Sequence, residues 1–164
     1  MFNRIIYGKI SEVNLRRIKL KLNGDVQIKA SYKEVFEFLT SPYEVVKCFP
    51  KGRITDAQNS IYFIAGNFNI PFSFSYSGEF YYDSVNEDVI ESTIKLNMLG
   101  GNVLINLLMN IKRVKDNITN VEWQGQFNHD DKISYLGEKL MLSGIQRTIK
   151  GAIKCIKKKV EKKA

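Results

Sequence analysis

The sequence has few of the residues that usually mark metal centres. Its 164 residues include one histidine, two cysteines and three prolines. Cys48 and Cys155 are too far apart in the chain for the close spacing of metal-binding cysteines. The histidine, His129, stands beside Asp130 and Asp131 in a polar segment, which we interpret as a solvated turn or a helix cap. We therefore expect no metal and no cofactor.

The sequence also lacks the usual signatures of catalysis. No serine stands in a Gly-x-Ser-x-Gly context, and no glycine-rich phosphate loop is present. The carboxylates Glu79, Asp83, Glu91 and Glu122 fall on polar strand faces or in turns. We assign no catalytic residue from the sequence.

Long hydrophobic runs are missing too. The best candidate, Val103–Ile111, is far shorter than the ~18 residues of a membrane span and is interrupted by Asn106 and Asn110. Residues 1–15 lack the apolar core of a signal peptide, so we expect a leader strand or short helix there, followed by one domain over 16–164. We interpret both cysteines as reduced thiols of a cytoplasmic protein, because nothing in the sequence supports a disulfide.

The net charge of +8 is concentrated at the end of the chain. One interpretation is a solvated last turn, whose cations suit the helix dipole. The other is a basic tail that docks at the periphery of an anionic membrane or on an acidic protein. Nucleic acid is not expected, because no aromatic residue is interleaved for base stacking. The lysines of this tail are Lys150, Lys154, Lys157, Lys158, Lys159, Lys162 and Lys163.

The first part of the domain predicts a strand followed by two short helices. Arg17–Lys29 alternates as a strand, and we expect a bulge at Asn23-Gly24, where glycine permits positive φ. Ser31 and Glu34 form a capping box that begins a helix, with Val35, Phe36 and Leu39 as its buried side. Pro42 begins a second short helix.

The middle of the chain alternates as strands, and its end predicts one long helix. Turns at 86–88, 100–101 and 116–117 separate the strands by hairpin spacing, which indicates an antiparallel meander. The helix runs from Lys132 to about Lys159, with Asp130 and Asp131 as candidate caps. Its glycines are spaced seven apart, so they should share one face where something comes close or space stays open. They are Gly137, Gly144 and Gly151.

A curved sheet around such a helix would enclose an apolar cavity. Plain core packing without space for a ligand is the alternative. The candidate ligand-binding residues are Phe74, Tyr76, Phe80, Ile94, Leu96, Ile105, Leu107, Trp123, Leu140 and Gly144. Candidate polar anchors are Tyr62, Tyr76, Tyr82, Ser92 and Arg147. Leu104, Leu108 and Tyr81 could add an exposed apolar patch for a partner or a homodimer.

The order of elements resembles the α+β helix-grip fold of the START/SRPBCC and pollen-allergen superfamily. Within it, the sequence resembles proteins like the G subunit of carbon monoxide dehydrogenase, from about Ile18 to Val160. The resemblance rests on the strand 24–31 leading into Glu34-Val35-Phe36, on 48–52 (CFPKG), with Lys51 as an insertion, on Trp123, and on Leu136-Gly137.

This resemblance implies a cavity for a hydrophobic molecule between sheet and helix. Members of this group are associated with lipid or quinone-like ligands and with assembly or membrane attachment of a molybdenum-containing dehydrogenase. Some carry a C-terminal membrane anchor, whereas this chain ends in 162–164 (KKA), so we expect only peripheral contact. Our first hypothesis is a non-enzymatic carrier of such a ligand. The alternatives are an assembly or adaptor module and a cyclase- or hydrolase-like enzyme of the same fold.

Overall fold

The computed structural model describes residues 19–69 and 73–164. The leader expected over 1–15 and the first residues of the domain lie outside these ranges. In chain order the elements are β1 (Lys19–Ile28), α2 (Tyr32–Leu39), α3 (Pro42–Val46), β2 (Arg53–Gln58), β3 (Ile61–Asn69), β4 (Ser73–Val85), β5 (Val89–Met98), β6 (Gly101–Lys115), β7 (Ile118–His129) and α4 (Tyr135–Lys163).

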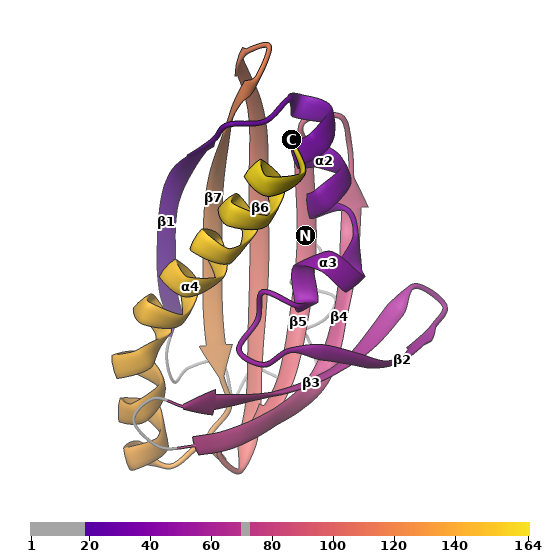
Figure 1. The fold of residues 1–164 in the computed structure, drawn as a ribbon. Helices are drawn as coiled ribbons and strands as arrows, with labels where there is room; N and C mark the ends of the chain where they lie inside the picture. Colours follow the sequence, from indigo (N-terminus) through magenta and orange to yellow (C-terminus); the bar gives the residue numbers. More distant parts are fainter. Residues whose placement is uncertain (1–18, 70–72) are drawn as a thin grey trace.

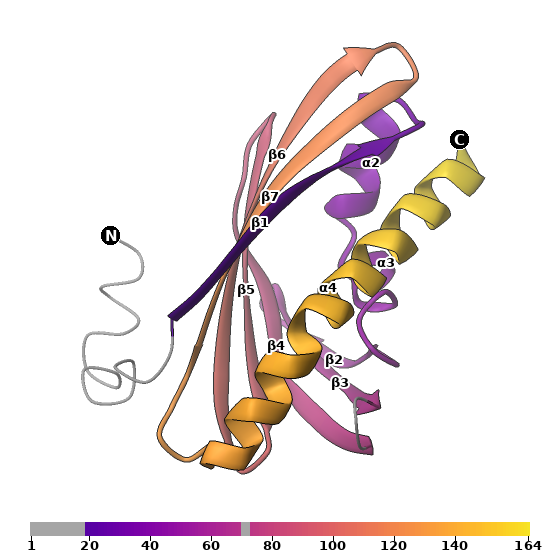
Figure 2. The ribbon, with the colours of Figure 1, turned by 90° about the vertical axis from the view of Figure 1, so that its left-hand side faces the viewer.

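The seven strands form one antiparallel sheet in the order β1-β7-β6-β5-β4-β3-β2. β2 to β7 follow one another as a meander, and β1 forms the edge of the sheet beside β7 (Figure 1). The sheet is strongly curved, and α2, α3 and α4 lie on the same side of it (Figure 2). This arrangement confirms the predicted curved sheet around a long C-terminal helix.

β1 is one continuous strand, so the predicted bulge at Asn23-Gly24 is wrong. Its pairing with β7 runs from Lys19 to Ile28 without a shift of register. Gly24 pairs with Trp123, and a Cβ atom at Gly24 would lie 3.0 Å from the indole ring. The glycine therefore makes room for tryptophan rather than for an irregular backbone.

The two short helices begin where the sequence predicts. The hydroxyl of Ser31 accepts a hydrogen bond from the Glu34 amide, and the Glu34 carboxylate accepts one from the Ser31 amide. α3 begins at Pro42. The buried side of α2 differs slightly from the prediction, because Phe38 is buried and Phe36 only half-buried.

The edge strand β2 has no counterpart in the sequence-based prediction. Its residues are mostly exposed, so the segment lacks the apolar alternation that reveals a strand. It pairs with β3 through a turn at Asn59 and Ser60, both of which have positive φ. In Figure 1 this hairpin extends away from the body of the sheet.

α4 begins at Tyr135, three residues later than predicted, because Ser134 is its cap. The Ser134 hydroxyl accepts a hydrogen bond from the Gly137 amide. Asp130 instead orders the preceding loop, since its carboxylate accepts bonds from the Asn102 and Lys132 amides.

The glycines of α4 have different surroundings, although we expected them to share one face. Leu136, which stands beside Gly137, is 65% exposed. Gly151 is exposed, and a Cβ atom added there would meet nothing within 4 Å. Gly137 does meet a neighbour, because its Cβ would lie 3.1 Å from the Ile133 side chain.

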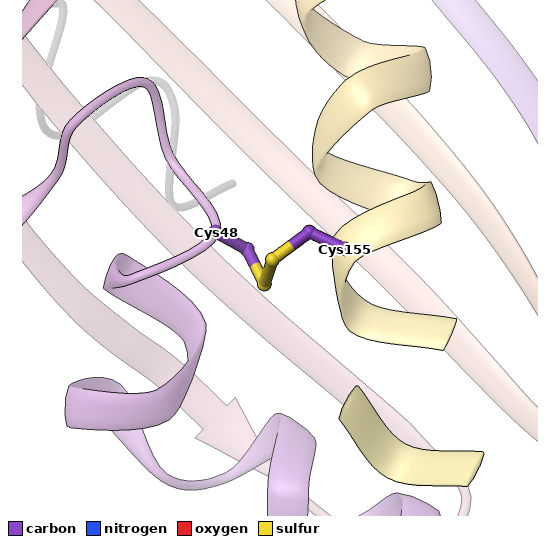
Figure 3. Close-up of a disulfide and its surroundings, with 2 residues drawn as sticks. All are labelled: Cys48 and Cys155. Carbon is purple, nitrogen blue, oxygen red and sulfur yellow. A yellow bond between two sulfur atoms is a disulfide. The ribbon is translucent and has the colours of Figure 1, made fainter. Parts of the chain in front are cut away.

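A disulfide joins Cys48 to Cys155, which corrects the expectation of two reduced thiols (Figure 3). The Cα atoms are 5.5 Å apart, within the usual range for a disulfide. It ties the segment after α3 to the last third of α4. Disulfides occur in oxidising compartments and in intracellular proteins of hyperthermophiles, so the cysteines no longer argue for a cytoplasmic location.

No helix within residues 19–69 and 73–164 is long and apolar enough to cross a membrane. Within the same ranges, histidine, cysteine and carboxylate side chains do not gather in threes or more as a metal site would require.

Candidate functional site: an apolar cavity beneath the long helix

A cavity of about 200 Å³ lies between the concave face of the sheet and α4. The strands contribute every second residue, as the two-residue period of a strand requires. On β5 these are Ser92, Ile94, Leu96 and Met98. The cavity therefore follows the sheet along much of its length rather than forming a local pit.

All ten predicted ligand-binding residues line this one cavity. They come from β4, β5, β6, β7 and α4, and their role in binding remains a prediction. They are Phe74, Tyr76, Phe80, Ile94, Leu96, Ile105, Leu107, Trp123, Leu140 and Gly144.

The sequence-based set missed the wall formed around α3. Leu39, Val45, Phe49 and Pro50 close the cavity on this side. Aromatic edge-to-face contact between Phe49 and Phe80, with ring centroids 5.9 Å apart, joins this wall to β4. The hydrophobic residues were visible in the sequence, but nothing there showed that a turn would fold over the sheet.

The middle of α4 forms the opposite wall and was also incompletely predicted. Its further lining residues are Met141, Ile145, Thr148, Ile149, Ala152, Ile153 and Ile156. Helical periodicity could have identified most of them, because they continue the apolar face that includes Gly144.

Two tyrosine hydroxyls in the lining are already engaged with the protein. Tyr76 donates to the carbonyl oxygen of Pro50 at 2.9 Å, and Tyr82 donates to that of Leu39 at 2.8 Å. Burial raises the pKa of Tyr76 to about 12 and raises that of Tyr82 still further. Both phenols therefore remain protonated near neutral pH and hold the α2–α3 wall against the sheet.

Ser92 differs from these tyrosines. The residue is 2% exposed, lines the cavity, and its hydroxyl has no hydrogen-bond partner. The other two predicted anchors, Tyr62 and Arg147, are not part of the lining, and Arg147 is exposed.

The described lining residues carry no ionisable group other than the tyrosines. Asp83 is a half-buried carboxylate with a raised pKa, caused mainly by burial. It accepts a 2.6 Å hydrogen bond from Thr93, which alternates with the lining residues Ser92 and Ile94 and so lies on the opposite face of the sheet. The interior of the cavity is therefore apolar and uncharged over its described part.

His129 is not solvated, contrary to the prediction. It is 2% exposed at the end of β7. Its Nε2 atom lies 2.8 Å from the Glu138 carboxylate, and its Nδ1 atom lies 2.8 Å from the Asp130 carbonyl oxygen. The histidine thus fixes the first turn of α4 to the sheet, and it does not belong to the cavity lining.

The apolar patch expected on the other face is less exposed than predicted. Leu104, Leu108 and Tyr81 are each half-buried. The homodimer for which they were the candidate surface remains a prediction.

The family is decided by a match over residues 24–161 to the family model of CoxG, the G subunit of carbon monoxide dehydrogenase. The chain belongs to the CoxG family. The matched region runs from the middle of β1 almost to the end of α4, and thus contains the whole described cavity. A search of curated proteins found no match to the sequence.

Solved structures confirm the START-like helix-grip fold. A conserved protein from Geobacillus kaustophilus superposes with a TM-score of 0.76 at 16% identity, over 87% of this chain and 96% of that one. The ZhuI aromatase/cyclase from Streptomyces sp. R1128 gives 0.66 at 9% identity, over 88% and 94%. A START superfamily protein from Mycobacterium smegmatis gives 0.59 at 14% identity, over 88% and 99%. At these identities the likeness concerns the fold alone.

Proposed function

We propose that this CoxG-family protein is a non-enzymatic carrier of a hydrophobic small molecule, a lipid or quinone-like compound, held beneath α4. The observation that carries the proposal is the apolar cavity between the sheet and α4, a space that a folded protein would otherwise fill with its own side chains. CoxG membership further suggests that the carrier serves a redox enzyme complex.

Apolar contacts of the size that the cavity offers allow only weak binding by themselves. Enclosing ~300 Å² of apolar ligand surface, at about 25 cal/mol per Å², would contribute about 7 kcal/mol. Association entropy would offset at least about 4 kcal/mol of this. Apolar contacts alone would therefore give an affinity weaker than micromolar, so tighter binding would need a polar contact.

The lining favours binding over the cyclase chemistry of the Streptomyces relative. A cyclase or hydrolase needs a group that moves a proton near neutral pH. The described lining offers only Tyr76 and Tyr82 as ionisable groups, and their pKa values are raised away from neutrality.

Native mass spectrometry after incubation with a cellular lipid extract tests the proposal. We expect an adduct with the wild-type protein and its loss in Gly144→Leu, which places a side chain in the cavity. Gly151→Leu is the matched control, because the same substitution seven residues later meets open space. A wild-type protein that takes up no lipid class would contradict the carrier function.

A second candidate function rests on a row of exposed lysines on α4. We propose that this row docks the protein on an anionic membrane surface. Four exposed lysines are spaced four residues apart and therefore share one helix face: Lys150, Lys154, Lys158 and Lys162. Two other lysines of the predicted tail have partners, since Lys157 pairs with Glu161 and Lys163 with Glu44.

Vesicle sedimentation tests this docking. The wild type should sediment with vesicles containing phosphatidylserine but not with purely zwitterionic ones, and high salt should release it. Glutamine at the four lysines of the row should abolish binding. The control is a variant that loses the same charge elsewhere, with glutamine in place of the exposed lysines Lys21, Lys33, Lys47 and Lys51. Equal binding of both variants would contradict a specific row, and capture of an acidic protein without vesicle binding would assign the row to that partner instead.

A further inference from the structure

The cavity is long, and its two ends are chemically different. From Ser92 to Met98 the lining covers six residue steps of β5, or roughly 20 Å. At one end, Ser92 pairs with Tyr82 on β4 and with Leu107 on β6. At the other end the lining is Met98 with Leu96 and Val103. Ser92 therefore places an unengaged hydroxyl near one end of a lining that is otherwise apolar, apart from the bonded tyrosines and Thr148.

This end lies beneath the α2–α3 wall. Tyr82, the neighbour of Ser92 in the sheet, donates its hydrogen bond to the carbonyl oxygen of Leu39, the last residue of α2. The disulfide between Cys48 and Cys155 fixes the segment that follows α3 to the adjacent part of α4. Ser92 thus lies in the part of the cavity that is covered by the end of α2.

The hydroxyl of Ser92 lowers the stability of the ligand-free protein. A buried polar group without a hydrogen-bond partner lowers stability, and folded proteins rarely leave one unpaired. The tyrosine hydroxyls at this wall are already bonded to carbonyl groups. The arrangement is explained if the partner of Ser92 arrives with the ligand.

We propose that Ser92 is the polar anchor of the cavity and selects a neutral amphiphile with an oxygen function, an alcohol or a ketone carbonyl, at one end of a long apolar body. The oxygen pairs with Ser92, while the apolar body extends towards Met98. This inference rests on the proposed carrier function and specifies its ligand class.

The same geometry selects against a charged headgroup at this end. A carboxylate beside Ser92 would be buried without a cation, because the described lining holds none. A fatty acid should therefore bind only in its protonated form, and its affinity should rise as the pH falls towards the pKa of the acid.

Displacement of Nile red by molecules of equal chain length tests the anchor. The probes are dodecane, 1-dodecanol, 2-dodecanone and dodecanoate. A single net hydrogen bond should make dodecanol and dodecanone bind about three- to tenfold more tightly than dodecane. Dodecanoate at neutral pH should bind more weakly than the alcohol.

Two serine variants separate the anchor from a structural role. Ser92→Ala should remove the preference for oxygen and raise the melting temperature of the ligand-free protein, because an unpaired hydroxyl is lost. Ser77→Ala, on an exposed position of β4, should change neither. A structural serine would instead lower the melting temperature when removed and leave the preference intact.

The outcomes distinguish this inference from the carrier function itself. Equal binding of dodecane and dodecanol to the wild type would overturn the anchor but not the carrier. Loss of the preference in Thr148→Val rather than in Ser92→Ala would move the anchor to α4 and overturn the assignment. Failure of every probe to bind would overturn the carrier function and the anchor with it.

Discussion

Gly66 makes room for the hydrogen bond that joins the turn after α3 to the sheet. A Cβ atom at Gly66 would overlap the hydroxyl of Tyr76 and would lie 2.5 Å from the carbonyl oxygen of Pro50. These two groups form the hydrogen bond. The Pro50 carbonyl also accepts a bond from the Asn67 amide, so three segments meet at this glycine.

Replacing each of two glycines with alanine should therefore have opposite effects on the free energy of unfolding. Gly66→Ala should lower the free energy of unfolding by about 1–3 kcal/mol, because the added methyl group displaces Tyr76 or Pro50. Gly151→Ala should raise it by about 0.5–1 kcal/mol, because the helix gains propensity and the position is open. Urea unfolding of both variants measures the difference, and a shift in the same direction would contradict it.

Glycines also show where prediction from this sequence fails at the scale of single residues. Judged by its neighbours in the chain alone, Gly24 suits a bulge as well as it suits a regular strand. The deciding contact is with Trp123, about a hundred positions away. Only the register of β1 against β7 brings the two together.

Among the elements, α4 is held at its C-terminal end by polar contacts with β1. The Glu161 carboxylate accepts hydrogen bonds from the Lys29 amide and from Lys157, both at 2.8 Å. Lys157 also donates to the Gln27 carbonyl oxygen at 2.6 Å. The hydrogen bond from Lys157, followed by that from Lys29, lowers the pKa of Glu161 below its ordinary value of 4.5.

This carboxylate should make the attachment of α4 sensitive to acid. Because the folded-state pKa is lowered, its contribution to stability is present above about pH 4.5 and is lost as the pH falls through the folded-state value. Glu161→Gln should therefore lower the melting temperature at pH 7, with a small effect because the contact is partly exposed. Melting curves from pH 7 to pH 3 should show wild type and variant converging, and a constant difference would contradict the role of the charge.

The disulfide should be the strongest single link between elements. It closes a loop across a separation of 107 residues, and it holds α4 to the segment after α3. Replacing both Cys48 and Cys155 with alanine should lower the free energy of unfolding by about 2–5 kcal/mol. Urea unfolding with and without reductant measures this loss. A wild-type protein that is insensitive to reductant, with two thiols labelled after denaturation, would contradict the link.

Local signals in the sequence predicted some element boundaries well and others poorly. The Ser31–Glu34 capping box and Pro42 placed the starts of α2 and α3 correctly, because these signals act within one helical turn. The start of α4 was misplaced because Asp130 also had the chemistry of a cap, whereas Ser134 takes that position. β2 was missed because an exposed edge strand needs no apolar alternation.

At the scale of the whole molecule, the period of the strands predicted which residues face inward. The eight strand residues selected in this way line one cavity, because alternation fixes the face of a strand regardless of what covers it. The covering parts were less accessible to prediction. The wall around α3, the disulfide and the burial of His129 all depend on how distant segments meet, which periodicity does not encode.

The attachments of α4 fall towards its two ends. Near its start, Glu138 contacts His129. From Cys155 onward, the disulfide and the contacts of Lys157, Glu161 and Lys163 hold it to β1 and to the α3 region. The helix is thus anchored near both ends, and its middle part lies over the cavity. A ligand in the cavity would pack against the middle of α4. The backbone amides there should then exchange with solvent more slowly than in the ligand-free protein.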